Sequence, residues 1–312
     1  QGRAVAAAEA AGDMIRDLGG VGALPTEGHL FYDDDNDIDN EEVIWRNDWS
    51  NSNGREEDNF PPSLFGRGRV NPTQNLVDAF PMANGYPLGH PSSGFDASEP
   101  FANRDPRLQQ YILFNGSVAR GDSIFTGVAS ELDGLGNTQE STRTGYYLRK
   151  LLRFDVNLTP DQQTEQRHFF AHFRYTEIFL NYAEAANEAW GPDDDPSGYG
   201  FTARQVIAAI RARAGIDPAD PYLASVTTKE DMRQLIRNER RLELSFEGFR
   251  FWDLRRWDMG LNEPARGLRI EGEQMQVFEV EDRLYQPFNI YGPIPQNEIV
   301  KYDGLLQNQG YL

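Results

Sequence analysis

Cysteine, lysine and long apolar runs are the scarce features of this 312-residue sequence. The absence of cysteine excludes disulfides, thiolate metal ligands, a cysteine nucleophile and a lipid-bearing N-terminal cysteine within this chain. No run of about 18 apolar residues occurs, so no segment has the apolar length of a membrane-spanning helix.

Lysine occurs at only three positions among 30 basic residues, whereas 49 residues are acidic and the net charge is −19. Such an acidic chain repels nucleic-acid phosphates and anionic lipid surfaces, which argues against binding to either. A carboxylate-rich, lysine-poor surface stays soluble in concentrated salt. The composition therefore fits a halophilic source and, equally, an ordinary acidic secreted protein.

Apolar residues at 3–4 spacing predict four helical segments. The first begins at Gly2 and ends at Gly19; no cap, signal or targeting segment precedes it, so we interpret the chain as the middle of a longer protein. The second begins near Arg174, and the third runs from Thr202 to Gly215. The fourth begins with a capping box formed by Thr227 and Glu230 and continues to about Glu247.

The rest of the chain is rich in turns. A short helix with Pro72 in its first position is expected before residue 80. Runs 111–114 and 146–154 are β-prone, and the tail 274–312 has a strand and turn pattern. The expected fold is mainly α, with tetratricopeptide-like helix pairs, long irregular loops and a few short β-hairpins. We divide it into a loop-rich ligand-binding region (20–165), a helical scaffold (166–260) and a strand and turn segment (261–312).

Carboxylates recur in the fourth helical segment, where Glu239, Glu243 and Glu247 share one face at i,i+4 spacing. A glycosidase pair needs a cleft between two acids and an apolar environment that raises the pKa of one of them. Arginine stands close to every candidate here and would instead lower its pKa. We therefore predict an ion-pair network that docks the helix, and no catalytic residue.

Three other patterns suggest metal or phosphate sites without completing them. His168 and His172 have the spacing of two metal ligands on one helical face, but Phe169 replaces the glutamate of a metalloprotease helix. The acidic run from Asp33 to Asp39 lacks the glycine and glutamate of a calcium loop, so a solvated loop is favoured over a calcium site. The GRGR sequence at 66–69 lacks the context and lysine of a phosphate loop. We predict no metal and no cofactor.

Aromatic residues in the turn-rich region lie among Asn, Ser, Gly and Arg rather than in periodic apolar segments. Flat rings beside amide and guanidinium donors suit sugars, whose C–H faces stack and whose hydroxyl groups form hydrogen bonds. The alternative is that these rings anchor long loops by burial. The candidate stacking residues are Trp45, Trp49, Phe65 and Tyr86, and the candidate hydrogen-bonding residues are Asn51, Asn53, Arg67 and Asn84.

Several segments together resemble the SusD/RagB family, in the family's order and over most of the chain. They are RYTEIFLNYAEAANEA, IRARAGI, NERRLELSFEGFRFWDLRRW, RDPRL at 104–108, GRGRVNPTQNLVDAF at 66–80 and the closing NEIVKYDGLLQNQGY. The family's N-terminal part, with its signal peptide and lipidated cysteine, has no counterpart.

The resemblance implies an outer-membrane lipoprotein on the surface of Bacteroidetes-type bacteria. Such proteins form a lid over a SusC-type TonB-dependent transporter and capture oligosaccharides, or in some members peptides, without catalysis. The membrane anchor would lie outside this chain. The ligand residues above come from composition, since loop aromatics vary within the family. The alternatives are a peptide-capturing member, a structural helical-repeat adaptor whose loop aromatics are all buried, and an extracellular glycosidase.

Overall fold

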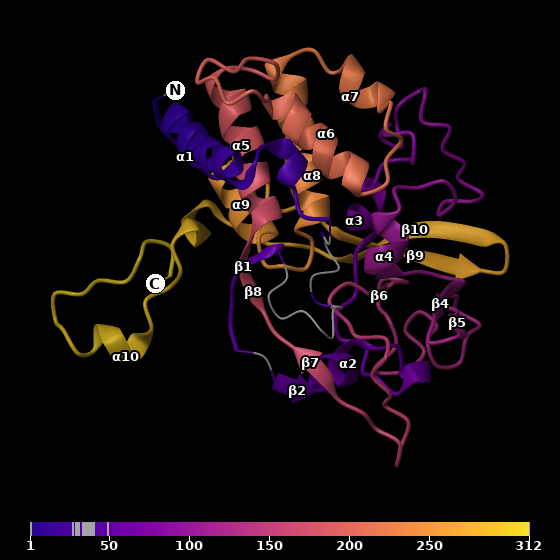
Figure 1. Ribbon diagram of the computed structural model, residues 1–312. Coiled ribbons are helices and arrows are strands. Elements are labelled where there is room, and N and C mark those ends of the chain that lie inside the picture. The colour runs from indigo at the N-terminus through magenta and orange to yellow at the C-terminus, as the bar shows by residue number, and fades with distance from the viewer. Residues whose placement is uncertain (1, 27, 29–31, 33–40, 49, 312) are drawn as a thin grey trace.

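The computed structural model describes residues 2–26, 28, 32, 41–48 and 50–311 (Figure 1). Four amphipathic helices form its frame, and α5 packs against each of the other three. Their apolar faces enclose one core, in which Phe179 and Tyr182 are fully buried. The mainly α prediction is confirmed. The frame helices are α1 (Gly2–Leu18), α5 (Tyr175–Ala189), α6 (Ala203–Arg213) and α8 (Lys229–Glu243).

Side-chain caps mark the starts of α6 and α8. The Thr202 hydroxyl accepts a hydrogen bond from the Gln205 N–H, and the Gln205 side-chain oxygen accepts one from the Thr202 N–H. The cap predicted for α8 at Thr227 is wrong by one residue, because Thr228 has the extended backbone of an N-cap and accepts from Asp231 N at 3.1 Å. The predicted end near Glu247 is also wrong. The chain turns after Glu243, before α9 (Arg250–Arg256) begins.

A second, loop-rich layer lies beside the frame and has cores of its own. It contains the short helices α2 (Gly54–Asn59), α3 (Gln74–Ala79) and α4 (Arg107–Tyr111), and the 3-10 turn η3 (Pro62–Leu64). Thr73 caps α3, so Pro72 lies before the helix and not in its first position as predicted. Further short elements are η1 (Val21–Ala23) and α7 (Pro221–Ser225).

The strands form five antiparallel pairs within the described residues. β1 (Val43–Arg46) pairs with β8 (Ala171–Arg174), and β2 (Ser50–Ser52) with β7 (Gln166–His168). The β-prone runs meet as β3 (Ile112–Leu113) and β6 (Tyr147–Leu148). Two hairpins complete the set, β4 (Ser117–Ala119) with β5 (Asp122–Ile124) and β9 (Ala265–Glu271) with β10 (Gln274–Glu281).

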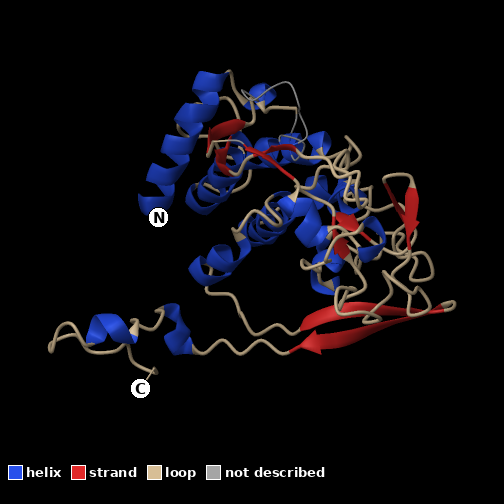
Figure 2. Cartoon of the chain, turned by 90° about the horizontal axis from the view of Figure 1, so that it is seen from below, coloured by secondary structure: helices blue, strands red, loops and turns tan. Residues whose placement is uncertain are grey.

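A C-terminal arm follows β10 and extends away from the body of the molecule (Figure 2). It carries η4 (Pro287–Ile290) and the one-turn helix α10 (Gln296–Ile299) among turns, close to the predicted strand and turn character. In the described part of the chain, every helix is too short or too polar to cross a bilayer.

Candidate functional site

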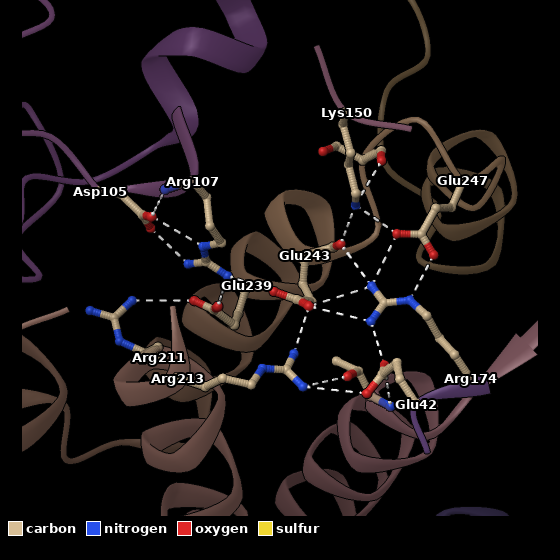
Figure 3. A network of polar contacts seen from close by, with 12 residues as sticks. Glu42, Asp105, Arg107, Lys150, Arg174, Arg211, Arg213, Glu239, Glu243 and Glu247 are labelled. Carbon is tan, nitrogen blue, oxygen red and sulfur yellow. Dashed lines mark hydrogen bonds and ion pairs between the residues drawn. The ribbon is translucent and has the colours of Figure 1, made fainter. Parts of the chain in front are cut away.

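Glu239 and Glu243 of α8, and Glu247 in the turn after it, lie in a buried ion-pair network, which Figure 3 shows. Arg107 donates to Glu239 at 2.5 Å and to Glu243 at 3.0 Å. Arg213 reaches Glu243 at 2.7 Å, and Arg174 reaches Glu247 at 2.7 Å. All three carboxylates therefore have guanidinium partners, which confirms the predicted ion-pair network.

The network also fastens the loop-rich layer to the frame. Glu42, just before β1, accepts from Arg174 at 2.6 Å. Lys150 is fully buried and donates to Glu247 at 2.6 Å and to two backbone carbonyls of the turn after α8. Glu42 and Lys150 were not predicted as members of the network, because both come from segments distant from α8 in the sequence. Lys150 could have been singled out as one of only three lysines.

Arginine charges dominate the electrostatics of this network. Burial alone would raise the pKa of Glu243, but Arg213, Arg174 and Arg107 outweigh burial and hold that pKa well below its usual value. The pKa of Glu247 is lowered in the same way, because the charges of Arg174 and Lys150 outweigh the effect of burial. Both groups stay charged at neutral pH, which suits structural ion pairs and not a general acid.

Acid is expected to unfold the protein cooperatively. A carboxylate whose pKa is depressed in the folded state contributes stability above its unfolded pKa of 4.5, and that stability is lost as pH falls towards the folded pKa. The melting temperature, followed by circular dichroism, should therefore decline steadily below about pH 5. A melting temperature that stays constant from neutral pH to pH 3 would contradict this account.

The two candidate metal ligands lie in separate strands, not on one helical face. Residues on either side of Phe169 and Phe170 pair with β1 and β2 and do not form a helix. Pairing with these strands decides the local structure, although the spacing of the two histidines is compatible with a helix. His168 Nε2 lies 2.9 Å from Glu56 Oε1, whereas the His172 ring stacks on Trp45. The acidic run from Asp33 to Asp39 lies outside the described residues. No cluster of three metal-ligating side chains occurs in the described ranges.

Trp45 lies on a two-stranded ribbon, which we define as β1 and β2 paired with β8 and β7. Its exposed fraction is 57%, and its ring centroid lies 4.5 Å from that of His172 and 5.8 Å from that of Phe173. Phe170, also exposed, meets His172 edge to face at 5.1 Å. These four rings form an exposed aromatic platform, of which only Trp45 was predicted.

The ribbon's geometry explains why the platform is exposed. β1 and β8 pair with a register irregularity on either side of Trp45, and such bulges re-aim side chains. The opposite side of the ribbon packs Val43 and Ala171 around buried Phe169 and Tyr32. The sequence contains a signal for this platform, because aromatic residues are concentrated in the segment RHFFAHFRY. We did not recognise it, because we interpreted the spacing of the two histidines as helical.

Asn51 and Asn53 lie farther along the chain than Trp45, in and just after β2. Asn51 lies in β2 opposite Arg167, and Asn53 precedes α2. No side-chain hydrogen bond engages either amide within the part of the chain that is described. Trp49, the other predicted ring of this region, lies outside the described residues.

Phe65 and Arg67 lie on the turn that follows η3. Phe65 is 54% exposed and has a left-handed backbone. Arg67 pairs with Glu57 at 2.6 Å, so its guanidinium is already engaged. A side chain at Gly66 would clash with the Phe60 carbonyl, which explains the glycine beside the exposed ring.

Asn84 and Tyr86 lie elsewhere, on a loop beside α7, which Figure 1 shows well apart from β1. The Asn84 amide donates to the Ser92 and Ser93 carbonyls and so holds its own loop together. Tyr86 stacks on His90 and contacts Tyr222. The structure thus brings Trp45 and Asn51 onto one ribbon, places Asn53 directly after β2 and keeps Tyr86 separate.

The other loop aromatics serve packing. Phe60 is fully buried, Phe101 stacks on Phe114, and Phe95 lies under the Arg104 guanidinium. Burial is therefore the role of some rings but not of Trp45 or Phe65. Exposure of these two rings disagrees with the adaptor alternative, which requires all loop aromatics to be buried.

Comparison with known proteins places the chain in a family. The sequence model of the SusD family matches residues 30–311, so the chain belongs to the SusD family. Two SusD-like proteins of Formosa agariphila are similar in sequence. One is 32% identical over 102 residues, covering 31% of this chain and 19% of the relative; the other is 27% identical over 169 residues, covering 53% and 29%.

Solved structures share the fold. A SusD-like protein from Bacteroides fragilis superposes with a TM-score of 0.72 at 28% identity, over 92% of this chain and 58% of its own. A SusD-like carbohydrate binding protein from the same species superposes with a TM-score of 0.74 at 24% identity, over 93% of this chain and 59% of its own. Surface glycan-binding protein A from Bacteroides fluxus gives 0.60 at 21% identity, over 100% and 60%. The chain thus spans at most 60% of each of these proteins.

Proposed function

We propose that this chain is a non-enzymatic, cell-surface nutrient-binding protein that captures oligosaccharides at the aromatic platform of Trp45, Phe170, His172 and Phe173. The observation that carries the proposal is the exposure of Trp45 on an ordered ribbon. A rigid exposed ring with two further rings beside it offers a flat apolar surface to a sugar face. Asn51 and Asn53 would supply hydrogen bonds to sugar hydroxyls.

Family membership supports this choice over other uses of an exposed ring. Two of the structural relatives are carbohydrate- or glycan-binding proteins by name. The α8 carboxylates, which a glycosidase reading would require, are held in ion pairs. Capture would serve import through a SusC-type TonB-dependent transporter in the outer membrane, with the protein on the extracellular face and its lipid anchor outside this chain.

Replacing Trp45 with alanine is expected to weaken saccharide binding about 30-fold, the equivalent of about 2 kcal/mol for the loss of a central tryptophan contact. Affinity electrophoresis against a panel of plant and algal polysaccharides would identify the ligand, and calorimetry with its oligosaccharides would measure the change. The melting temperature should hardly move, because the side chain is exposed.

Trp252→Ala is the matched control, since Trp252 is 64% exposed but lies on α9, outside the platform. The affinity of Trp252→Ala for the saccharide should equal that of the wild type. Equal losses in both variants, or no loss in Trp45→Ala, would remove the platform from the binding site. Binding of peptides but of no polysaccharide would favour the peptide-capturing alternative.

A further inference from the structure

A cavity of about 250 Å³ lies where the end of α8, the start of α9 and the chain after β10 meet α3. Three guanidinium groups line it, those of Arg241, Arg250 and Arg283, and one carboxylate, that of Glu263. We call it the arginine pocket. Two positive charges in excess are unexpected in a chain whose net charge is −19.

Among the described residues, no carboxylate pairs with these three arginines, in contrast to the arginines of the ion-pair network. Arg107, Arg174 and Arg211 each pair with at least two carboxylates. Within the described residues, the side chains of Arg250 and Arg283 make no hydrogen bond or ion pair. In the same part of the chain, the Arg241 side chain donates to the Asn75 carbonyl alone, at 2.8 Å.

The nearby acids are already engaged. Glu263 accepts from the Asn75 amide at 2.7 Å and lies 3.7 Å from Arg266. Asp253 on α9 is held by Arg240 at 2.7 Å and by Arg256 at 2.8 Å. Neither acid forms an ion pair with a guanidinium group of the pocket in the described residues, although the charge of Glu263 acts on Arg241 and Arg250. The pocket therefore keeps an excess of positive charge for an external anion.

Partial burial makes the unpaired Arg250 cation costly. Desolvation, together with the charge of Arg241, lowers the pKa of Arg250 to about 10. An unpaired, half-buried cation loses hydration without recovering it in an ion pair. An anion in the pocket would supply the missing interaction, through the paired N–H groups that arginine presents to carboxylates and sulfates.

The remaining lining indicates what accompanies that anion. Ser245 is 6% exposed, and its hydroxyl has no hydrogen-bond partner within the described residues, although it lines the pocket. Phe246, Leu254 and Leu261 add apolar surface. The volume lies below the roughly 300–1,000 Å³ of pockets for drug-sized ligands, so it suits one small ring or chain end.

We propose that the arginine pocket binds the anionic group, a carboxylate or a sulfate ester, of an acidic saccharide, with Arg241, Arg250 and Arg283 as its partners and the Ser245 hydroxyl as a further donor. The saccharide part of this inference rests on the proposed function. The anionic part rests on the pocket alone. The pocket is distinct from the aromatic platform, because none of its lining residues lies on the ribbon.

The test compares charged and neutral ligands by calorimetry. Trigalacturonate is compared with its carboxyl-reduced counterpart, and a carrageenan oligosaccharide with its desulfated form, so that the two arms separate carboxylate from sulfate. We expect the wild-type protein to prefer at least one charged member by about tenfold or more, as charge-assisted hydrogen bonds provide. High salt should diminish that preference.

Arg250→Gln and Arg283→Gln should abolish the preference for the charged member over its neutral counterpart. Arg283 is exposed, so its substitution tests the pocket without risk to folding. Arg16→Gln, which removes an exposed arginine on α1, is the matched control and should keep the preference.

Equal affinity for charged and neutral members would overturn this inference while the proposed function stands. Binding of no saccharide would overturn the proposed function, and inorganic sulfate would then be titrated alone. Sulfate binding that is lost in Arg250→Gln would keep the anion site; the absence of sulfate binding would overturn it.

Discussion

Replacing Glu243 with glutamine is expected to lower the free energy of unfolding by about 3–5 kcal/mol, the usual cost of breaking a buried ion pair from one side. Glu243 is 2% exposed and lies between Arg107 at 3.0 Å and Arg213 at 2.7 Å, with Arg174 at 3.4 Å. Glutamine keeps the shape but removes the charge, so three guanidinium groups lose a shared partner. Urea denaturation followed by fluorescence measures the change.

Glu273→Gln provides the control, because Glu273 is exposed in the turn between β9 and β10. It should change the free energy of unfolding by no more than about 0.5 kcal/mol. Acid sensitivity should also decrease in Glu243→Gln, since one carboxylate with a depressed pKa is gone. A loss below about 1 kcal/mol in Glu243→Gln would show that the network does not depend on its central acid.

Replacing Lys150 with methionine is the second large effect, with an expected loss of about 3 kcal/mol in the free energy of unfolding. The ammonium group donates to the carbonyls of Glu243 and Ser245 at 2.8 and 3.1 Å and to Glu247 at 2.6 Å. It also lies 4.3 Å from the Tyr111 ring centroid. Methionine fills similar space but leaves all these acceptors without their donor.

Two effects oppose each other at Lys150. Burial lowers the pKa of Lys150, so the charged form bears a desolvation cost that methionine would relieve. The unpaired acceptors left behind outweigh this relief, because each buried unsatisfied group costs about 1–3 kcal/mol. Lys301→Met, at an exposed position on the arm, should be neutral. If Lys150→Met were as stable as the wild type, the relieved desolvation cost would equal the cost of the unpaired acceptors, and this prediction would be wrong.

Helices were predictable from the sequence where one apolar face decides the structure. The spacing of Tyr175, Phe179 and Tyr182 located α5 to within a residue or two, and Thr202 located the start of α6. The ends of α8 were harder. Two adjacent threonines compete for its cap, and the helical pattern continues past Glu243 although the chain turns there.

The strands of the ribbon were not predictable in the same way. β1 and β8 have four residues each, and Trp45 pairs with Phe173, far away in the sequence. Such short strands have little local signal, because their stability comes from the partner strand. The helical reading of HFFAH failed for this reason, and Phe170, His172 and Phe173 were missed with it.

The candidate ligand residues fall into two groups, those that are accessible to a ligand and those whose polar groups are already used within the protein. Trp45 could be chosen because it stands among polar residues, and its exposure fits that choice. Arg67 and Asn84 look equally suitable in the sequence, yet Arg67 pairs with Glu57 and Asn84 holds its own loop. Composition names the residue type that can bind a sugar, whereas tertiary contacts decide whether its polar atoms are free.

Hydrogen exchange with and without ligand tests most directly the central claim that recognition occurs on the ribbon while the ion-paired helices only support it. The wild-type protein would be compared alone and with saturating oligosaccharide from the tightest-binding polysaccharide of the panel. We predict slower exchange in β1 and β8, around Trp45 and Phe173, and unchanged exchange in α5 and α8. Protection confined to α5 and α8, with β1 and β8 unaffected, would contradict the account.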